Sequence, residues 1–385
     1  MINELKQKIE SNRQTKNIFW IFLVLIKDLL WFLSEKFKNI SSYIFGSISN
    51  YLVSFFNFFS SEKYNFDVDV VYVYANGNDP DFLKQKSALL KKMDRNDPLL
   101  KESTAPNRFN DYGELKYSLR SVISYAPWIR NIYIVTSTPN IKWLNLDTDQ
   151  KNIFIISHES VFPSIKCLPN FNASSIEMFL DKIPGLAEHF IYFNDDTFLG
   201  GNVSKSDFFT SNGECLFNFK DNFYYQEKEN FRAPRLYQPL KTKHAIELIM
   251  KKYARTRVYE PIHQVRPVLK SVFSTCKNDF LAECNKTSMN KFRSADDISL
   301  INIIFPSYAI YNNFGRVSNK FILNHAFILL SDNLIINELR LERLINKKPK
   351  LFCLGDDTSF YNNEVQKQID KYLQEYFPLK SEFEV

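Results

Sequence analysis

Phe190-Ile-Tyr-Phe-Asn-Asp-Asp196 carries four apolar residues directly before an amide and two carboxylates. A short apolar run without period-2 alternation is typical of a strand that is covered on both faces. Adjacent carboxylates repel each other unless something neutralises them, and Mg²⁺ commonly bridges carboxylates and substrate phosphates. The run therefore predicts a buried strand that ends at a site for Mg²⁺ or Mn²⁺ on Asp195 and Asp196. The alternative is a capped turn in which water solvates both side chains.

Three further runs have the same apolar character, at Asp69–Tyr74, Asn131–Thr136 and 152–156. A helical pattern lies between the first two, because Leu115, Leu119 and Val122 recur on one face of residues 111–125. A second helix, opening at Ser174 or Ser175, lies between the third run and residue 190. Strands that alternate with helices predict an α/β fold with a mainly parallel sheet.

Each predicted strand ends in a polar turn. The first leads into Asn76-Gly77-Asn78-Asp79 and the fourth into Asn194-Asp195-Asp196, while residues 137–140 and 157–159 follow the other two. Open α/β sheets bind ligands at the carboxyl ends of their strands. We therefore expect Asn76, Gly77, Asp79 and Asn194 to line a binding site. Asp79 before Pro80 also suits an Asx turn, and Asp69 suits a cap at the entry of the first strand; these roles would make both residues structural.

Composition narrows the classes of function. The chain has 385 residues, of which 45% are hydrophobic, a net charge of +6 and only 9 glycines. It contains no GxGxxG or GxxxxGK[ST] motif, so side chains or a metal would have to hold a nucleotide. The basic residues are spread along the chain, which argues against a nucleic-acid partner. Five cysteines without a CxxC pair favour a reducing cytosol.

Residues 1–62 differ from the remainder. The apolar runs at 18–26 and 43–59 are broken by charged or polar residues and flanked by lysines. They are too interrupted for a spanning helix, which needs about 20 apolar residues. We expect interfacial helices on a membrane surface; the alternative is a helical hairpin that packs on the catalytic part or joins copies into a homo-oligomer. Residues 63–360 are predicted to be catalytic, with an insertion or lid at 213–262, and 361–385 to be a charged helix and tail.

The second half of the chain offers two candidate residues. His263 suits a general base, although a lone histidine is more often structural. Residues 291–305 are predicted to be helical, with Ser294 as a possible cap. Arg293 beside this helix start suits a phosphate, or else an ion pair with Asp296 or Asp297. Residues 244–275 are predicted to be helical around Pro261. On the helix at 111–125, Arg120 and Glu114 either pair with each other or line the site.

Taken together, four blocks resemble the Stealth family of hexose-1-phosphate transferases, which includes bacterial capsule polymerases and the lysosomal-enzyme GlcNAc-1-phosphotransferase. The blocks, of which the second is the longest and most specific, are Asp69–Pro80, Arg108–Asp196, a stretch with His263 and Arg293, and Leu351–Asp357. Val73-Tyr74 stands where the family usually has Thr-Trp, and Gly355 where it has Asn. The latter difference leaves open whether Asp356 and Asp357 join the site.

The resemblance implies a glycosyltransferase-A-like fold and transfer of a sugar-1-phosphate from a nucleotide sugar, such as a UDP-sugar, to a saccharide hydroxyl. A metal would sit on Asp195 and Asp196, Arg293 would clamp the transferred phosphate, and His263 would take the proton of the hydroxyl. The substrate pocket would draw on further residues in the matched blocks, namely Asp69, Asn76, Gly77, Asp79, Arg120, Asn172 and Asn194. The enzyme would work at the cytoplasmic face of the inner membrane.

Two other functions stay open at this stage. An ordinary glycosyltransferase would use the same fold and acidic pair, but would move the sugar alone and release a nucleoside diphosphate. A membrane-bound scaffold for polysaccharide assembly would need neither His263 nor Asp195 for chemistry. The released nucleotide separates the first alternative from phosphate transfer, and substitution of the acidic pair tests the second.

Overall fold

The computed structural model describes residues 64–94, 96–146, 152–225, 237–255, 257–322 and 324–385. Residues 64–385 form one compact unit. The interfacial helices predicted at 1–62 lie outside the described residues, as do positions 226–236 of the predicted lid. Within the described ranges, no helix has the length and apolar character needed to cross a membrane.

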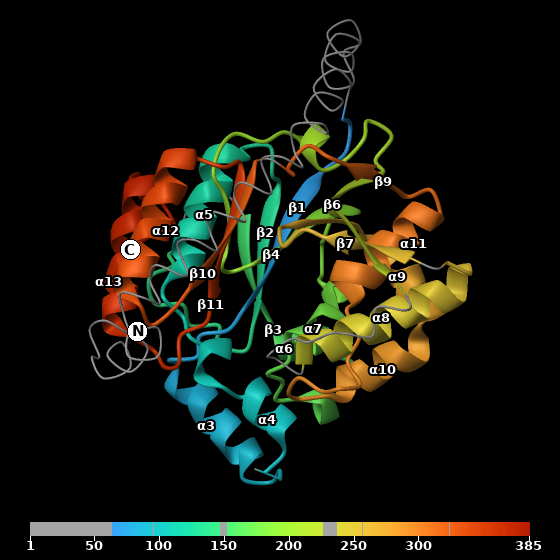
Figure 1. The fold of residues 1–385 in the computed structure, drawn as a ribbon, viewed down its shortest axis with the longest axis horizontal. Coiled ribbons are helices and arrows are strands. Elements are labelled where there is room, and N and C mark those ends of the chain that lie inside the picture. Colours follow the sequence, from blue (N-terminus) through green and yellow to red (C-terminus); the bar gives the residue numbers. More distant parts are fainter. Residues whose placement is uncertain (1–63, 95, 147–151, 226–236, 256, 323) are drawn as a thin grey trace, which may run out of the picture. The chain divides into compact units, whose positions relative to one another are not determined.

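A five-stranded sheet forms the centre of the unit (Figure 1). Its strands are β1 (Val68–Tyr74), β2 (Asn131–Thr136), β3 (Asn152–Ser157), β4 (His189–Asn194) and β8 (Arg266–Leu269), in the order β3-β2-β1-β4-β8. The first four run parallel, and β8 is antiparallel to β4. The predicted α/β class and mainly parallel sheet are confirmed, and all four predicted strands are present.

Two smaller sheets flank the centre. In one, β10 (His325–Leu330) runs parallel to β11 (Leu351–Asp356), and β5 (Thr197–Leu199) lies antiparallel to β11. In the other, β6 (Cys215–Tyr225) pairs with β7 (Arg257–Pro261) and β9 (Gly315–Ser318). Because β5 follows β4 after two residues, the chain passes directly from the central sheet into the first small sheet.

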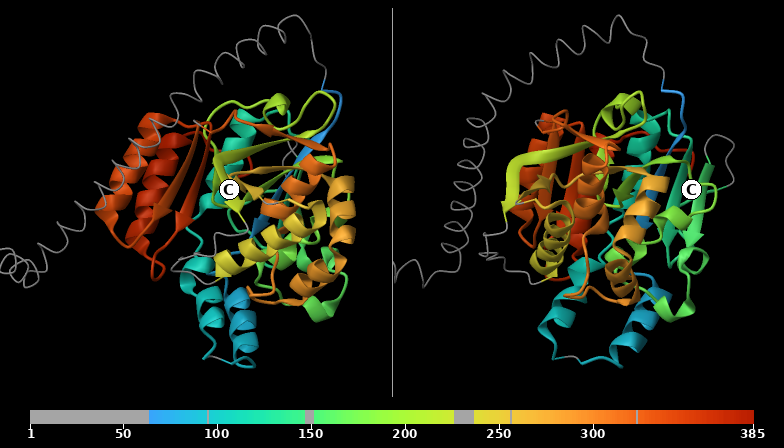
Figure 2. Two further views of the ribbon diagram at one scale, coloured as in Figure 1. Left: turned by 45° about the vertical axis from the view of Figure 1, so that its right-hand side comes forward. Right: turned by 90° about the vertical axis from the view of Figure 1, so that its right-hand side faces the viewer.

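Helix α5 (Glu114–Tyr125) lies between two hydrophobic cores. Leu115, Leu119 and Val122 belong to the core on the central sheet. Tyr117 belongs to a second core, built with β11, α12 (Leu334–Lys347) and α13 (Asn363–Tyr376). Figure 2 shows α12 and α13 together against the β10–β11 sheet. The amphipathic pattern predicted α5 correctly, but its polar side faces a second core.

Helices α3 (Pro80–Leu90) and α4 (Pro98–Ser103) lie at one end of the unit, beyond the carboxyl end of β1 (Figures 1 and 2). Asp79 caps α3 by accepting hydrogen bonds from the backbone of Asp81 and Phe82 (both 2.9 Å), and Asp97 caps α4. A cluster of phenylalanines fixes the pair to the rest of the unit: Phe82, Phe109, Phe171 and Phe292, together with Leu100.

The remaining helices surround the other side of the central sheet (Figure 1). They are α6 (His158–Val161), α7 (Ala173–Glu177), α8 (Tyr237–Tyr253), α9 (Lys270–Asp279), α10 (Leu281–Met289), a π-helix (Leu300–Ile304) and α11 (Phe305–Tyr311). Short 3₁₀ turns occupy Pro106–Arg108, Ile165–Cys167, Leu180–Lys182 and Lys205–Asp207.

Two predictions for the second half were wrong. The helical region expected at 244–275 contains β7 and β8, because residues 257–261 and 266–269 pair with strands that are distant in the sequence. The helix expected at 291–305 begins only at Leu300, as a π-helix. Residues 291–299 form a loop in which the Phe292 carbonyl and the Asp297 carboxylate accept hydrogen bonds from the Asn172 side chain. The hydrophobic pattern alone did not distinguish these two strands and this loop from helices.

Candidate active site

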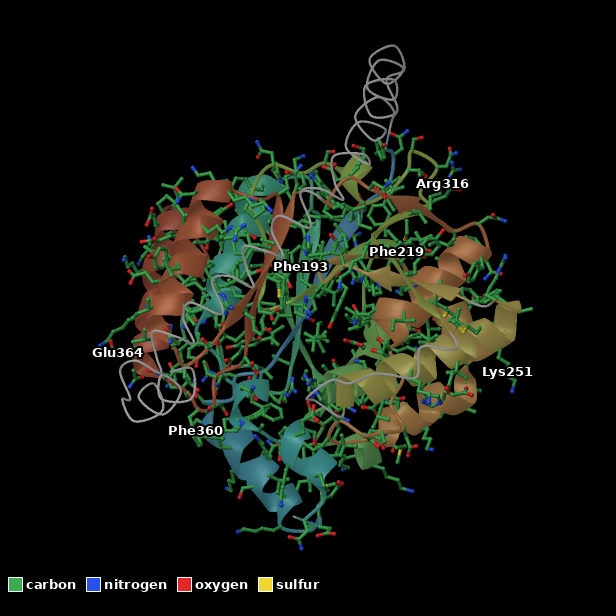
Figure 3. All side chains as sticks on the ribbon, viewed as in Figure 1. Phe193, Phe219, Lys251, Arg316, Phe360 and Glu364 are labelled. Atoms are coloured by element: carbon green, nitrogen blue, oxygen red, sulfur yellow. The ribbon has the colours of Figure 1, made fainter. Side chains whose placement is uncertain are left out.

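The turn at Asp195–Asp196 joins the central sheet to the small sheet of β5, β11 and β10. Phe193, labelled near the middle of Figure 3, marks the end of β4 just before it. The backbone carbonyl of Asp196 accepts a hydrogen bond from the Leu354 amide (2.9 Å), which ties the turn to β11. Both carboxylates are half-buried. The pair is therefore held rigidly at the edge that the sequence predicted.

The acidic pair ionises reluctantly. Burial, followed by repulsion from Asp196 and Asp111, raises the pKa of Asp195 well above its ordinary value. Burial raises the pKa of Asp196 to about 6, although hydrogen bonds from the Cys353 thiol and the Thr197 hydroxyl oppose this shift. Two half-buried carboxylates with raised pKa values are an unfavourable arrangement at neutral pH unless a cation joins them.

Two further carboxylates belong to this acidic group, Asp111 and Glu114 from the start of α5. The Asp111 side chain accepts from the Tyr74 hydroxyl (2.5 Å) and the Gly113 amide (2.8 Å), and the helix itself begins after Gly113. Burial is the largest cause of the raised pKa of Glu114, and Asp111 and Asp195 add to it. The sequence offered Glu114 as a site residue or as a partner of Arg120; the structure places it with Asp195.

Asp356 supports the acidic group from β11. Its carboxylate accepts from the Asn110 side chain (2.9 Å) and from the backbone of Thr358 (2.7 Å). It therefore anchors the loop that carries Asp111, whereas Asp357 is exposed. Asp356 therefore acts on the site indirectly, by holding the loop that carries Asp111.

His263 lies near the same end of β4. Since β8 is antiparallel to β4 and Arg266 pairs with Tyr192, the segment before Arg266 extends past the carboxyl end of β4. The ring of His263 is exposed and lies 5.1 Å from the Phe327 ring. Desolvation of the imidazole by the surrounding protein, followed by the positive charges of Arg266 and Lys220, lowers the pKa of His263 to about 4. The imidazole is therefore neutral at pH 7 and able to accept a proton.

A cationic group surrounds His263 and extends to Arg293. Lys241 is buried, donates to the Ser174 hydroxyl (2.7 Å) and interacts with Glu177 and Arg293. Burial lowers the pKa of Arg266 to about 10. Lys241 and Arg266 carried no signal in the sequence, because each is a single basic residue in an ordinary run. Only the fold brings them to His263.

Glu177 of α7 balances part of this positive charge. Its Oε1 accepts from the Tyr192 hydroxyl (3.0 Å), and the same hydroxyl also donates to the Asn194 side chain (2.8 Å). Burial raises the pKa of Glu177, while Lys241, Tyr192 and Arg293 oppose that shift. Asn194 is thus fixed between the acidic pair and the cationic group.

The turn after β1 lies beside the acidic group's loop. A Cβ at Gly77 would lie 1.8 Å from the carbonyl oxygen of Phe109, so only glycine fits. The Asn76 side chain accepts from the Asn78 amide (2.9 Å), and the Asn78 side chain donates to the Asp111 carbonyl (3.2 Å). Asn76 and Gly77 are therefore at the predicted edge, but the carboxylate of Asp79 serves as the α3 cap.

Three predicted substrate residues have structural roles instead. Asp69 is at the opposite end of β1, fully buried, and is bonded to Arg130 (2.7 and 2.9 Å). Arg120 faces α13 and forms a buried bidentate pair with Glu384 (2.6 and 2.7 Å). Asn172 is buried and donates to Asp297 (2.9 Å). Asn172 still fixes the loop that carries Arg293, but its own amide is not available to a substrate.

The described residues contain no cluster of three or more His, Cys, Asp and Glu side chains arranged around a metal position. Asp195 and Asp196 supply oxygen donors of the type that Mg²⁺ and Mn²⁺ accept. An open pair of this kind suits a cation that substrate phosphates also bind, and does not suit a closed structural metal site.

Comparison with known proteins gives consistent matches over most of the chain. Residues 108–217 match the family description Stealth protein CR2, conserved region 2. An exopolysaccharide phosphotransferase of Streptomyces coelicolor is 31% identical over 323 residues, which cover 83% of this chain and 52% of that protein. The chain thus spans about half the length of this relative, and 33% of a second Streptomyces coelicolor relative.

Two relatives match over most of their own length. A capsular polysaccharide phosphotransferase of Actinobacillus suis is 30% identical over 319 residues, 81% of this chain and 83% of that protein. One from Neisseria meningitidis serogroup B is 30% identical over 329 residues, 83% of this chain and 84% of that protein. This degree of shared sequence over shared length confirms the resemblance seen in the four blocks. The chain belongs to the Stealth protein family.

Proposed function

We propose that the chain transfers a hexose-1-phosphate, or an N-acetylhexosamine-1-phosphate, from a nucleotide sugar to a saccharide hydroxyl in capsule or exopolysaccharide synthesis. The names of the relatives support polysaccharide phosphate transfer. The observation that carries the proposal is the placement of two groups of opposite charge at the carboxyl end of β4: the acidic group around Asp195 and the cationic group around His263.

The donor would bind where β1 and β4 lie side by side. Strands β2 and β3 are added on one side of β1, whereas β4 and β8 lie on its other side, so the strand order reverses between β1 and β4. Open α/β sheets bind ligands in the crevice at such a reversal. The glycosyltransferase-A-like type of fold, which the family resemblance implies, is part of this proposal. Asp195 and Asp196 would hold Mg²⁺ or Mn²⁺, which when bound neutralises the diphosphate of a UDP-sugar or a related donor. Asn76 and Gly77 would line the donor side.

In the reaction, the acceptor hydroxyl oxygen forms a bond to the phosphorus nearest the sugar. The bond from that phosphorus to the bridging oxygen of the diphosphate breaks, and a nucleoside monophosphate leaves with the electron pair. The hydroxyl proton passes to the neutral imidazole of His263. Arg293 binds the transferred phosphate bidentately, supported by Lys241 and Arg266, because phosphoryl transfer depends on positioning and charge stabilisation.

We further propose that the enzyme works at the cytoplasmic face of the inner membrane, with residues 1–62 at the membrane surface. Its partners would be the nucleotide sugar and a saccharide or growing polysaccharide acceptor. The apolar, lysine-flanked runs at 18–26 and 43–59 support this assignment.

The released nucleotide tests the proposal. Incubation with a panel of nucleotide sugars and an acceptor should yield a nucleoside monophosphate and a phosphodiester. Chromatography identifies the released nucleotide, and phosphorus NMR identifies the phosphodiester. Release of a nucleoside diphosphate instead would mean that the chain is an ordinary glycosyltransferase.

Two substitutions test whether the chain is an enzyme or a scaffold. We expect Asp195→Asn and His263→Ala each to lower kcat by about 10²–10⁴-fold, the usual contribution of a positioned acid or base. Asp94→Asn and His244→Ala, in the α3–α4 connection and α8, are the matched controls and should retain activity. Full capsule or polysaccharide production by the Asp195→Asn and His263→Ala variants would support the scaffold instead.

A further inference from the structure

Helices α3 and α4 line an open cavity of about 460 Å³ that is separate from the acidic and cationic groups. Three leucines form its apolar wall, and two lysines, a serine and a threonine complete it. Leu100 is buried at its base, whereas Leu83 is 48% exposed at its mouth. An aliphatic wall of this kind favours a hydrocarbon chain more than a sugar, which would need more hydrogen-bonding groups.

Lys86 is the half-buried cation of this cavity. Its Nζ donates to the Thr104 carbonyl (3.2 Å) and lies 3.8 Å from the centre of the Phe109 ring. Burial lowers the pKa of Lys86 to about 8. A cation kept among leucines and a phenylalanine gains stability when an anion approaches. The cavity therefore suits a ligand with both an aliphatic part and a negative charge.

The surface around the cavity has the same two properties. Met93, in the connection after α3, is 39% exposed and adds to the apolar surface of Leu83. Residues 80–108 contain seven basic and four acidic residues, a net charge of +3. The exposed cations include Lys84, Lys91, Lys92 and Lys101. Apolar residues beside lysines are typical of segments that bind the interface of anionic membranes.

We propose that α3 and α4 dock on an anionic lipid bilayer, with a lipid chain against the leucines and its phosphate on Lys86 and Lys101. This contact is distinct from residues 1–62, and it does not depend on the transfer reaction. Because α3 follows the carboxyl end of β1, docking there brings the candidate active site near the membrane surface.

A fluorescent label at the cavity tests the proposal in the full chain. The five native cysteines are all buried, so a Ser87→Cys variant can be labelled with an environment-sensitive NBD group at the cavity wall. With vesicles of phosphatidylglycerol and phosphatidylcholine, we expect emission at position 87 to shift to shorter wavelength and rise several-fold. Pure phosphatidylcholine should give little change. A label at Lys251→Cys, on α8 (Figure 3), is the control and should stay water-like.

Two lysine substitutions supply the charge test. Lys86→Met and Lys101→Met should each weaken the vesicle response at position 87 about fivefold, from roughly 1 kcal/mol per basic residue near an anionic surface. Lys251→Met should leave it unchanged. A water-like label at position 87 in protein that is bound to vesicles would overturn the proposal. So would a response to dodecyl phosphate below its micellar concentration without a response to vesicles, because the occupant would then be a single soluble amphiphile.

Discussion

The Asp195 carboxylate lowers the stability of the cation-free protein near neutral pH, although the proposed function requires it. Its carboxylate is half-buried and repelled by Asp196 and Asp111, and its pKa is raised in the folded chain. A raised folded pKa contributes stability that is present below the unfolded value and is lost as pH rises through the folded value. For Asp196 that window runs from about pH 4 to about pH 6. Near neutral pH, both carboxylates therefore reduce the stability of the cation-free protein.

We predict that Asp195→Asn stabilises the cation-free protein at pH 7.5 by about 1 kcal/mol, which corresponds to a rise in Tm of roughly 2 °C. At pH 4 the gain should disappear, because the wild-type carboxyl groups are then largely protonated. Thermal unfolding in EDTA at both pH values is the measurement. The exposed control Asp94→Asn should show no such gain. Equal Tm values for wild type and Asp195→Asn at pH 7.5 would contradict the prediction.

At the scale of single residues, position along a strand decided which predicted site residues lie at the ligand edge of the sheet. Asn194 ends β4 and Asp195 follows it, and the polar turn there was visible in the sequence. Asp69 was assigned to the same site, but it lies at the amino end of β1, where it receives hydrogen bonds from Arg130 and from the amides of Asn131 and Ala187. A carboxylate at the entry of a parallel strand cannot reach the ligand edge.

At the scale of elements, Arg120 connects α5 to α13 and the segment after it. Its guanidinium donates to Glu384, to the Gln374 side chain (3.0 Å) and to the Phe377 carbonyl (2.6 Å). Removing one partner of a buried ion pair leaves the other charge without compensation, at a cost of about 3–5 kcal/mol. The second core therefore depends on this pair for its closure against α5.

We expect Glu384→Gln to lower the free energy of unfolding by roughly 3 kcal/mol in urea titrations, with kcat per folded molecule unchanged. The control is Glu364→Gln on the surface of α13 (Figure 3), where the i,i+3 pair with Lys367 is exposed and worth less than about 0.5 kcal/mol. If Glu384→Gln lowered kcat but left the urea midpoint unchanged, the structural role of Arg120 would be wrong and its predicted role in the substrate pocket would stand.

Elements with a clear local sequence pattern were the predictable ones. Strands β1 to β4 and helix α5 follow from apolar runs and from one helical face. Strands β7 and β8 escaped prediction because their short sequences, RVYEP and RPVL, contain proline and charged residues and so lack a continuous apolar run. Arg120 on the polar side of α5 was expected to pair with Glu114 or to line the site, but α13 and the segment after it cover this side chain. Tertiary contacts therefore overrode patterns that were correct in themselves.

At the scale of the whole molecule, the acidic group makes the fold responsive to a cation and a diphosphate together. Mg²⁺ alone would bind weakly to two carboxylates, whereas a nucleoside diphosphate adds further oxygen ligands. Ligands that bind only the folded state stabilise it by mass action, by about 2.7 kcal/mol at 100 times the dissociation constant. The two ligands should therefore act more than additively on Tm.

We predict that UDP, or the diphosphate of the true donor, raises Tm clearly in the presence of Mg²⁺ and little in its absence. Thermal unfolding over a grid of both concentrations is the measurement. Asp195→Asn should remove the joint effect and leave any small effect of UDP alone. An unchanged joint effect in that variant would place the cation elsewhere in the molecule.

The ion pair of Arg120 and Glu384 can form only late in the synthesis of the chain. The two residues are 264 positions apart. A ribosome that adds 5–20 residues per second needs about 13–50 s to reach the second after the first. During that interval α5 can pack on β1 and β2. The Arg120 guanidinium still lacks its counter-ion, and the outer face of α5 is not yet covered by the second core. A nascent chain of this protein is therefore a candidate client for a chaperone that binds exposed apolar helices, until the acidic partner emerges and closes the fold.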